Sequence, residues 1–275
     1  MDFSQKALDL RRIIIKMNYV SGSGHLTSAY SCLEIMTYLY FSGLLKYDAS
    51  NPLWDGRDYF ILSKGHAAMG LYAVLSKAGF FPENELWTFC GVGTRLGGHP
   101  SSRIPGIETV TGSLGHGLSF SVGLALGLKT KQRNNKVYCI TGDGELQEGS
   151  NWEAALSINQ FNLNNLVWII DKNELQLSGK TQSIMDLNDL SAQLSAIGFD
   201  VRDINGHNFT EIADALNRID KKPVAIIANT VKGYGTPSIA GKEGWHGRKP
   251  NKDELAVILN ELGMTQEDLE IEKNI

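Results

Sequence analysis

The feature that most constrains the fold is a strand–turn–helix–strand unit near the middle of the chain. A β-rich run, KVYCIT at residues 136–141, ends at Gly142-Asp143-Gly144, and a second apolar run, NLVWIID, covers residues 165–171. A helix is expected between them, at about residues 152–160. This order and spacing predict a right-handed βαβ crossover in a parallel sheet.

The same alternation extends over most of the chain. Further strands are predicted at residues 59–63, 199–204 and 224–229. Helices are predicted at residues 3–20, 31–41, 67–78, 118–131 and 210–219, the last with Thr210 as its N-cap. We therefore expect an α/β fold with a mostly parallel central sheet and helices on both faces. A length of 275 residues suits one large domain with an added tail, which we place at residues 1–250 and 251–275.

Composition excludes several classes of function. The formal net charge of −4 gives no sign of a nucleic-acid-binding surface, and no apolar run is long enough to cross a membrane. The three cysteines, Cys32, Cys90 and Cys139, are far apart and form no CxxC pair. This pattern argues against a disulfide framework and predicts a reducing, cytoplasmic location. We expect neither a nucleic acid nor a membrane as a partner.

Two polar residues follow the strands of the central unit. Asp143 lies just after the first strand and Asn173 just after the second. Both should project at the carboxyl edge of the sheet, where open α/β folds bind ligands. Carboxylate and amide oxygens suit Mg²⁺, which completes its coordination with phosphate oxygens and water. The alternative is that GDG is only a tight turn and Asn173 a loop residue.

Four histidines lie in glycine-bearing loops. They are His25 in SGSGHL, His66 in SKGHA, His99 in GGHP and His246 in GWHG. Histidine can orient or protonate an alkoxide and can donate to phosphate. Any one of them alone could be a structural loop residue, and a zinc cluster is disfavoured because their spacing fits no zinc motif. We interpret His207, in NGHN, as structural.

A glycine-rich loop precedes the small-residue helix at residues 118–131. Its sequence is TGSLGHG at residues 111–117. The backbone of such a loop could contact a flat heterocycle or form an anion site at the start of the helix. A plain glycine turn explains the same residues equally well. The whole segment 90–116 has little periodicity, and long loops within compact domains are usually functional.

Taken together, these motifs resemble the transketolase family over nearly the whole chain. The blocks SKGHA, GGHP, GSLGHGLS, GDGELQEG, and KGYG followed by GWHG occur in the family's order, and GDG with the later asparagine resembles its thiamine diphosphate signature. SKGHA and GGHP favour transketolase over deoxyxylulose-phosphate synthases and 2-oxo-acid dehydrogenases. The resemblance implies the thiamine diphosphate-binding fold and transfer of a two-carbon ketol unit from a ketose to an aldose, either of which can be a phosphate.

The resemblance also implies a role for each matching residue. Mg²⁺, with Ca²⁺ or Mn²⁺ able to substitute, should be held by Asp143, Asn173 and the carbonyl of Leu175. The expected cofactor-binding residues are His66, Gly112, Ser113, Leu114, Gly142, Asp143, Gly144, Glu145, Asn173 and His246. The expected catalytic residues are His25, His66, His99, His246 and Glu148. Among these, His25 and His99 should bind sugar hydroxyls, and Glu148 should join a glutamate network between subunits.

The resemblance covers only the family's first domain. In the family, the glutamate that contacts the aminopyrimidine ring lies in a separate pyrimidine-binding domain, as do the arginines that bind sugar phosphate. The resemblance therefore implies a second polypeptide, a C-terminal transketolase subunit that carries this glutamate. Family members of this split type combine two copies of each subunit, so we expect an α2β2 assembly.

Three residues depart from the family's usual pattern. His116 replaces a common glutamine, Leu26-Thr27 follows His25 where Pro-Gly is common, and Ser178 stands where aspartate is frequent. Two alternatives stay open, and these departures motivate the first of them. One is another thiamine diphosphate enzyme, either a 2-oxo-acid decarboxylase or an acyloin-type synthase. The other is a degenerate subunit that scaffolds its partner, which the intact Asp143, Asn173 and loop histidines argue against.

Overall fold

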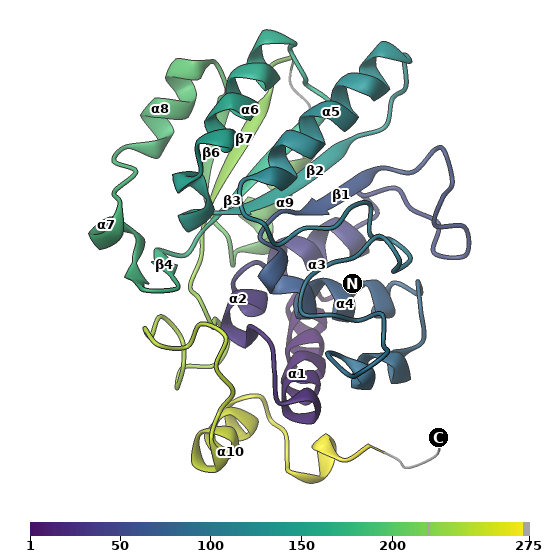
Figure 1. Cartoon of the computed structure of the whole chain (residues 1–275), viewed down its shortest axis with the longest axis vertical. Coiled ribbons are helices and arrows are strands. Elements are labelled where there is room, and N and C mark those ends of the chain that lie inside the picture. The colour runs from purple at the N-terminus through teal and green to yellow at the C-terminus, as the bar shows by residue number, and fades with distance from the viewer. Residues whose placement is uncertain (219–220, 272–275) are drawn as a thin grey trace.

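A five-stranded sheet forms the centre of the molecule in the computed structural model, which describes residues 1–218 and 221–271 (Figure 1). All strand pairs in this sheet are parallel, and the order is β1-β2-β3-β7-β6. The strands are β1 (Tyr59–Leu62), β2 (Val137–Gly142), β3 (Leu166–Lys172), β6 (Asp200–Asn205) and β7 (Val224–Asn229). The expected parallel α/β architecture is confirmed.

Helices cover both faces of the sheet (Figure 1). The α-helices are α1 (Phe3–Ser21), α2 (Leu26–Ser31), α3 (Leu33–Phe41), α4 (Ala68–Lys77), α5 (His116–Thr130), α6 (Gly149–Gln160), α7 (Thr181–Ile184), α8 (Leu190–Ile197), α9 (Phe209–Asn217) and α10 (Lys252–Glu261). Short 3₁₀ turns occur at η1 (Gly65–Ala67), η2 (Glu83–Thr88), η3 (Gly144–Gln147) and η4 (Glu267–Leu269). Among the residues described, none of these helices could span a membrane.

Alternation along the strands creates two cores, one on each face. In β2, Tyr138 and Ile140 belong to the core that contains α1, α3, α4 and α9. Their neighbours Val137 and Cys139 belong to the opposite core, under α5, α6 and α8. Successive side chains of a strand point to opposite faces, so an apolar run such as VYCI supplies both cores. This is why β1, β2, β3 and β7 lack an apolar–polar alternation.

Side-chain caps fix the starts of four helices, α1, α8, α9 and α10. Asp2 accepts hydrogen bonds from the backbone N–H groups of Ser4 and Gln5 at the start of α1. The predicted cap of α9 is wrong by two residues, because Asn208 and not Thr210 accepts from the backbone at this site. Asparagine reaches the free amides of the first turn better than threonine does. This helix ends at Asn217, and the expected end, Ile219, lies outside the described residues.

Several elements differ from the expectations. The helix expected at residues 31–41 corresponds to α3, and a separate short helix, α2, which was not predicted, meets it at Cys32. A small antiparallel hairpin, β4 (Leu175–Gln176) and β5 (Gly179–Lys180), follows β3 and was not predicted. Helices α7 and α8 were not predicted either. The hairpin begins two residues after Asn173.

The C-terminal segment packs on α1 and shares its core. Leu255, Ile258 and Leu259 of α10 are buried in the same cluster as the apolar residues of α1. The Nε atom of Arg12 donates to the carbonyl oxygen of Leu262 at 2.9 Å, and Lys16 donates to the carbonyl of Asp268 at 2.9 Å. A capping box at Asn251 starts the helix. The division of the chain near residue 250 stays a prediction.

Two neighbouring residues of α10 test this packing. Ile258 is fully buried, whereas Val257 is 49% exposed. We expect Ile258→Ala to lower the free energy of unfolding by about 2–5 kcal/mol, because it removes buried apolar contacts and leaves a cavity. Val257→Ala should change it by less than about 0.5 kcal/mol. Urea denaturation of both variants provides the measurement, and equal effects would contradict the packing described.

Candidate active site

The carboxyl ends of four strands surround one cavity. Residues at the ends of β1, β2, β3 and β7 meet His25, which caps α2, and residues of the loops at 99 and 112 around a space of about 340 Å³. Open parallel sheets bind ligands at this edge. The cavity is lined by His25, Lys64, His66, His99, Gly112, Leu114, Gly142, Asp143, Gly144, Glu145, Asn173, Leu175, Gln176, Leu177, Lys232 and His246.

Asp143 and Asn173 are brought together beside the short segment that follows β3. One oxygen of Asp143 accepts from the N–H of Glu174 at 2.7 Å, and the other accepts from the N–H of Gly144 at 2.9 Å. The amide oxygen of Asn173 accepts from the N–H of Leu175 at 3.1 Å. Both side chains are buried, with 3% and 9% exposure. Two hard oxygen donors therefore line one cavity beside the backbone of residues 174–175.

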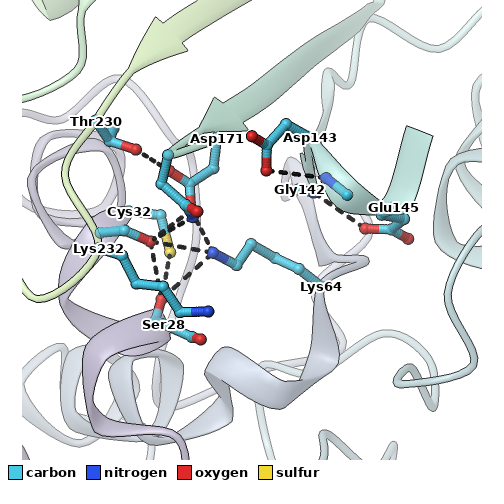
Figure 2. Close-up of polar contacts among 12 residues, drawn as sticks. Ser28, Cys32, Lys64, Gly142, Asp143, Glu145, Asp171, Thr230 and Lys232 are labelled. Carbon is cyan, nitrogen blue, oxygen red and sulfur yellow. Dashed lines mark hydrogen bonds and ion pairs between the residues drawn. The ribbon is translucent and has the colours of Figure 1, made fainter. Parts of the chain in front are cut away.

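A buried ion pair lies beneath these residues (Figure 2). The ammonium of Lys64 contacts the carboxylate of Asp171, and both side chains are almost fully buried. Asp171 also accepts from the hydroxyls of Ser31, at 2.6 Å, and Thr230. The Nδ2 atom of Asn173 donates to Asp171 at 3.3 Å, which fixes the orientation of the Asn173 amide. Within the pair, Lys64 lowers the pKa of Asp171 although burial alone would raise it.

The four loop histidines form one cluster. The ring centroid of His25 lies 5.4 Å from that of His66, 4.9 Å from that of His246 and 6.2 Å from that of His99. His66 and His246 lie 5.2 Å apart. Residues from four separate loops thus converge at one cavity. In the part of the chain that the structure describes, no three His, Cys, Asp or Glu side chains are arranged to hold a metal ion.

Burial and nearby lysines keep three of these histidines neutral. Burial, followed by the charges of His99, Lys232 and Lys64, lowers the pKa of His25 from 6.5 to about 4. Burial and then Lys232 lower the pKa of His246 to about 3, and burial followed by Lys64 lowers that of His66 well below its ordinary value. At neutral pH these imidazoles can each donate one hydrogen bond and accept another.

Two glycines allow the loops of the site to approach one another. A Cβ atom on Gly65 would lie 2.6 Å from the backbone nitrogen of Gly112. Gly112 itself has a φ of +126°, and a Cβ there would lie 2.4 Å from Cδ2 of His99. Larger residues would separate the SKGHA, GGHP and GSLG segments. These glycines therefore serve to bring His66 and His99 to the same cavity.

Two of the predicted residues do not line the cavity. Ser113 and Glu148 are exposed outside it, with Glu148 at the start of α6. Glu145 lines the cavity, but its carboxylate accepts from Ser63 at 2.5 Å and from the N–H of Gly115 at 3.0 Å. It connects loops around the cavity. The roles expected for these residues stay predictions.

Sequence reasoning missed Lys64, Gln176, Leu177 and Lys232. Lys64 and Lys232 lie within the motifs SKGHA and KGYG, in which the histidine and the glycines were interpreted as functional and the lysines were not. Both lysines are nearly fully buried, at 1% and 3% exposure. Gln176 and Leu177 belong to the hairpin that was not predicted.

A second cavity of about 450 Å³ adjoins the first and shares Asp143, Asn173 and Leu175 with it.

The buried ion pair should be essential to stability. We expect Lys64→Met to lower the free energy of unfolding by about 3–5 kcal/mol, because it leaves the charge of Asp171 buried and unpaired. Adding Asp171→Asn should recover part of the loss. The control is Lys77→Met, which breaks a partly exposed pair with Glu83 and should cost below about 1 kcal/mol. Denaturant unfolding of the four proteins would refute the pairing if the double variant were no better than Lys64→Met.

The lowered histidine pKa values predict a loss of stability in acid. His25 takes up a proton near pH 6.5 in the unfolded chain but near pH 4 in the fold. The unfolded chain therefore binds more protons in this window, and the free energy of unfolding should fall as the pH falls from about 6.5 to about 4. His25→Gln should make this dependence shallower. Unfolding curves at several pH values check this, and an unchanged slope would contradict it.

Comparisons with known proteins agree with this site. The family described as the thiamine diphosphate binding domain of transketolase matches residues 4–275. One subunit of the apulose-4-phosphate transketolase of Actinobacillus succinogenes is 42% identical over 265 residues, covering 95% of this chain and 96% of that protein. The SqwG subunit of the 6-deoxy-6-sulfo-D-fructose transketolase of Clostridium sp. (strain MSTE9) is 38% identical over 266 residues, covering 95% and 96%.

Solved structures show the same relationship. Transketolase from Leishmania mexicana matches with a TM-score of 0.90 and 26% identity, covering 99% of this chain and 43% of that one. Transketolase from Campylobacter jejuni matches with a TM-score of 0.89 and 29% identity, covering 96% and 43%. The chain thus spans less than half of these solved enzymes but nearly all of the two subunits. It belongs to the transketolase family as a transketolase-type transferase, and residues 4–275 match the family's thiamine diphosphate-binding domain.

Proposed function

We propose that this subunit holds the diphosphate and metal end of thiamine diphosphate and, with a separate pyrimidine-domain subunit, transfers a two-carbon ketol unit from a ketose to an aldose. One observation carries the proposal. The oxygen donors of Asp143 and Asn173 and the cluster of four histidines line the same cavity. An anion-and-metal site and a sugar-binding site are therefore within reach of one cofactor.

The residues present fit a magnesium diphosphate. Asp143, Asn173 and the carbonyl of Leu175 would hold Mg²⁺, which Ca²⁺ or Mn²⁺ could replace. Gly144 would offer its backbone N–H to the diphosphate, and the buried ammonium groups of Lys64 and Lys232 supply positive charge nearby. Among the residues that the structure describes, the buried Nδ1 atom of His25 has no hydrogen-bond partner, as expected of a group that meets a ligand.

The chemistry divides between the cofactor and the protein. Thiamine diphosphate, when bound, supplies the carbon nucleophile and the electron sink for carbon–carbon bond cleavage. The protein's share is positioning and charge stabilisation. His25 and His99 would bind the sugar hydroxyls and donate to oxygen as charge develops there. His66 and His246 would contact the diphosphate and face the reacting carbon. Neutral imidazoles suit these roles because they both donate and accept.

The proposed enzyme includes a partner subunit. Two relatives are each named as one subunit of an apulose-4-phosphate transketolase, which supports a second polypeptide here. We propose that this partner is a C-terminal transketolase subunit carrying the pyrimidine-domain glutamate. We propose an α2β2 assembly, in which the exposed Glu148 joins a carboxylate network between the chains. The three free cysteines are consistent with the cytoplasmic location that we propose.

The names of the relatives suggest a class of substrate. They mention apulose-4-phosphate and 6-deoxy-6-sulfo-D-fructose, which carry a phosphate or a sulfo group. We propose that this enzyme also accepts a sugar with an anionic group. Leu26 and Thr27, which depart from the usual Pro-Gly, are fully buried behind His25 and would influence substrate choice through its position.

Removal of the metal-binding carboxylate tests the cofactor site. Asp143→Ala should abolish binding of thiamine diphosphate in the presence of Mg²⁺, because the ion that links protein and diphosphate is lost. Isothermal titration calorimetry, run with the partner present and again with it absent, measures this. The control is Asp214→Ala, an exposed carboxylate on α9, which should bind normally. Full cofactor affinity of Asp143→Ala with its partner would show that the metal assignment is wrong.

The reaction itself is tested with the reconstituted pair of subunits. Ketose phosphates and a sulfo-ketose would be offered with an aldose acceptor, and 2-oxo acids would be offered in parallel. We expect transfer products from the sugars and no release of CO₂ from the oxo acids. Release of CO₂ without ketol transfer would favour a decarboxylase. A pair that binds the cofactor but converts neither class would contradict the proposed activity.

A further inference from the structure

Lys232 makes a contact that the expected roles of the site do not include. It follows β7 in the KGYG loop and is only 3% exposed. Its Nζ atom lies 2.9 Å from the Nδ1 atom of His246. Figure 2 shows its side chain extending toward Lys64. A buried lysine therefore touches one of the four clustered histidines.

The chemistry of the two groups decides the direction of this hydrogen bond. A lysine ammonium has three N–H donors and no acceptor. Burial and then Lys64 lower the pKa of Lys232 to about 8, so it remains mostly an ammonium at neutral pH. His246 is neutral there and has one nitrogen with a free lone pair. Nδ1 must therefore accept from Lys232, and the ring proton must lie on Nε2.

We propose that Lys232 is a positioning residue that holds His246 in its Nε2–H tautomer and so presents a hydrogen-bond donor to a ligand oxygen in the cavity. Among the described residues, no protein group bonds to the Nε2 atom of His246, which leaves this N–H for a ligand. The use of the donor in ketol transfer rests on the proposed function. The tautomer itself is a property of the free chain.

The loop that carries Lys232 is anchored on both sides of it. The N–H of Val231 donates to Nε2 of His207 at 2.8 Å, and the N–H of Gly233 donates to the carbonyl oxygen of Thr27 at 3.0 Å. The hydroxyl of Thr27 donates to the carbonyl oxygen of Trp245 at 3.1 Å. Thr27 thus ties the backbone beside Lys232 to the backbone beside His246. These hydrogen bonds fix the backbone on both sides of the contact, so that Nζ of Lys232 stays within hydrogen-bond distance of Nδ1 of His246.

His207 provides an internal reference of the opposite tautomer. Its Nε2 atom accepts from the backbone N–H of Val231, which can only donate. Its Nδ1–H must therefore donate to the carboxylate of Glu34, which lies 3.0 Å away. The structure thus assigns Nε2–H to His246 and Nδ1–H to His207. One spectrum of the same molecule can distinguish the two.

The test is nitrogen NMR of the full chain labelled with ¹⁵N-histidine near neutral pH. Long-range ¹H–¹⁵N spectra separate protonated from unprotonated ring nitrogens, and His246→Gln assigns the signals of His246. We expect an unprotonated Nδ1 and a protonated Nε2 for His246, with the reverse for His207. In Lys232→Met, both ¹⁵N shifts of His246 should move toward their average as the second tautomer becomes populated. Lys232→Gln, which keeps an N–H donor, should restore the wild-type pattern.

Controls separate this effect from unfolding and from failure of the proposed enzyme. The signals of His207 should stay unchanged in all folded variants, and Lys242→Met, at an exposed lysine, should leave His246 unchanged. Wild-type His246 with its proton on Nδ1, or shifts of His246 that do not respond to Lys232→Met, would overturn the proposal. Because the readout needs neither cofactor nor partner, lack of ketol transfer would refute the proposed function without affecting the tautomer.

Discussion

The carboxylate of Asp171 connects the segments from which the site is built. Lying near the end of β3, it binds Lys64 after β1, Ser31 in α2, Thr230 after β7 and the amide of Asn173. A buried charge is tolerated only when it is paired and its remaining lone pairs are bonded. Those bonds can form only when the carboxyl ends of β1, β3 and β7 and the helix α2 lie together. The demands of one charge therefore define the geometry of this edge.

A second buried carboxylate lies nearby but lacks such a partner. Asp143 accepts hydrogen bonds from the backbone of Gly144 and Glu174 and from the hydroxyl of Thr181, and no ion pair involving it forms among the described residues. The ammonium of Lys64 is already paired with Asp171. The two carboxylates thus differ: one is neutralised within the fold, and the other keeps its charge for a cation. This asymmetry favours Asp143 as the metal ligand.

The sequence predicted the parts of the fold that depend on local pattern. The strands β2 and β3 begin and end within one residue of the expected positions because their apolar runs are bounded by polar and glycine residues. The hairpin after Asn173 could not be predicted, since its two-residue strands are too short to show periodicity. The short helix α2 could not be predicted for a different reason, because its six residues, LTSAYS, are all buried and show no apolar stripe.

In the site too, the sequence predicted what local motifs mark and did not predict what depends on the three-dimensional surroundings. The four histidines and Asp143 could be found because glycine loops mark them, but their convergence depends on strand order, which no local pattern encodes. Lys64 and Lys232 could not be recognised as buried, since lysine is almost never buried without a partner.

The burial of Lys64 and Lys232 makes the site electropositive, a property that the sequence motifs did not show. The pKa of Lys232 and those of His25, His66 and His246 are all lowered, in each case by burial first and by positive neighbours afterwards. Such a cavity disfavours any further positive charge in its histidine cluster. An anion relieves this repulsion and raises these pKa values. The cavity thus presents two kinds of group, the buried lysines and the neutral imidazoles. A ligand that brings a diphosphate to the lysines and leaves the imidazoles neutral matches both, whereas an uncharged sugar alone would match only the imidazoles.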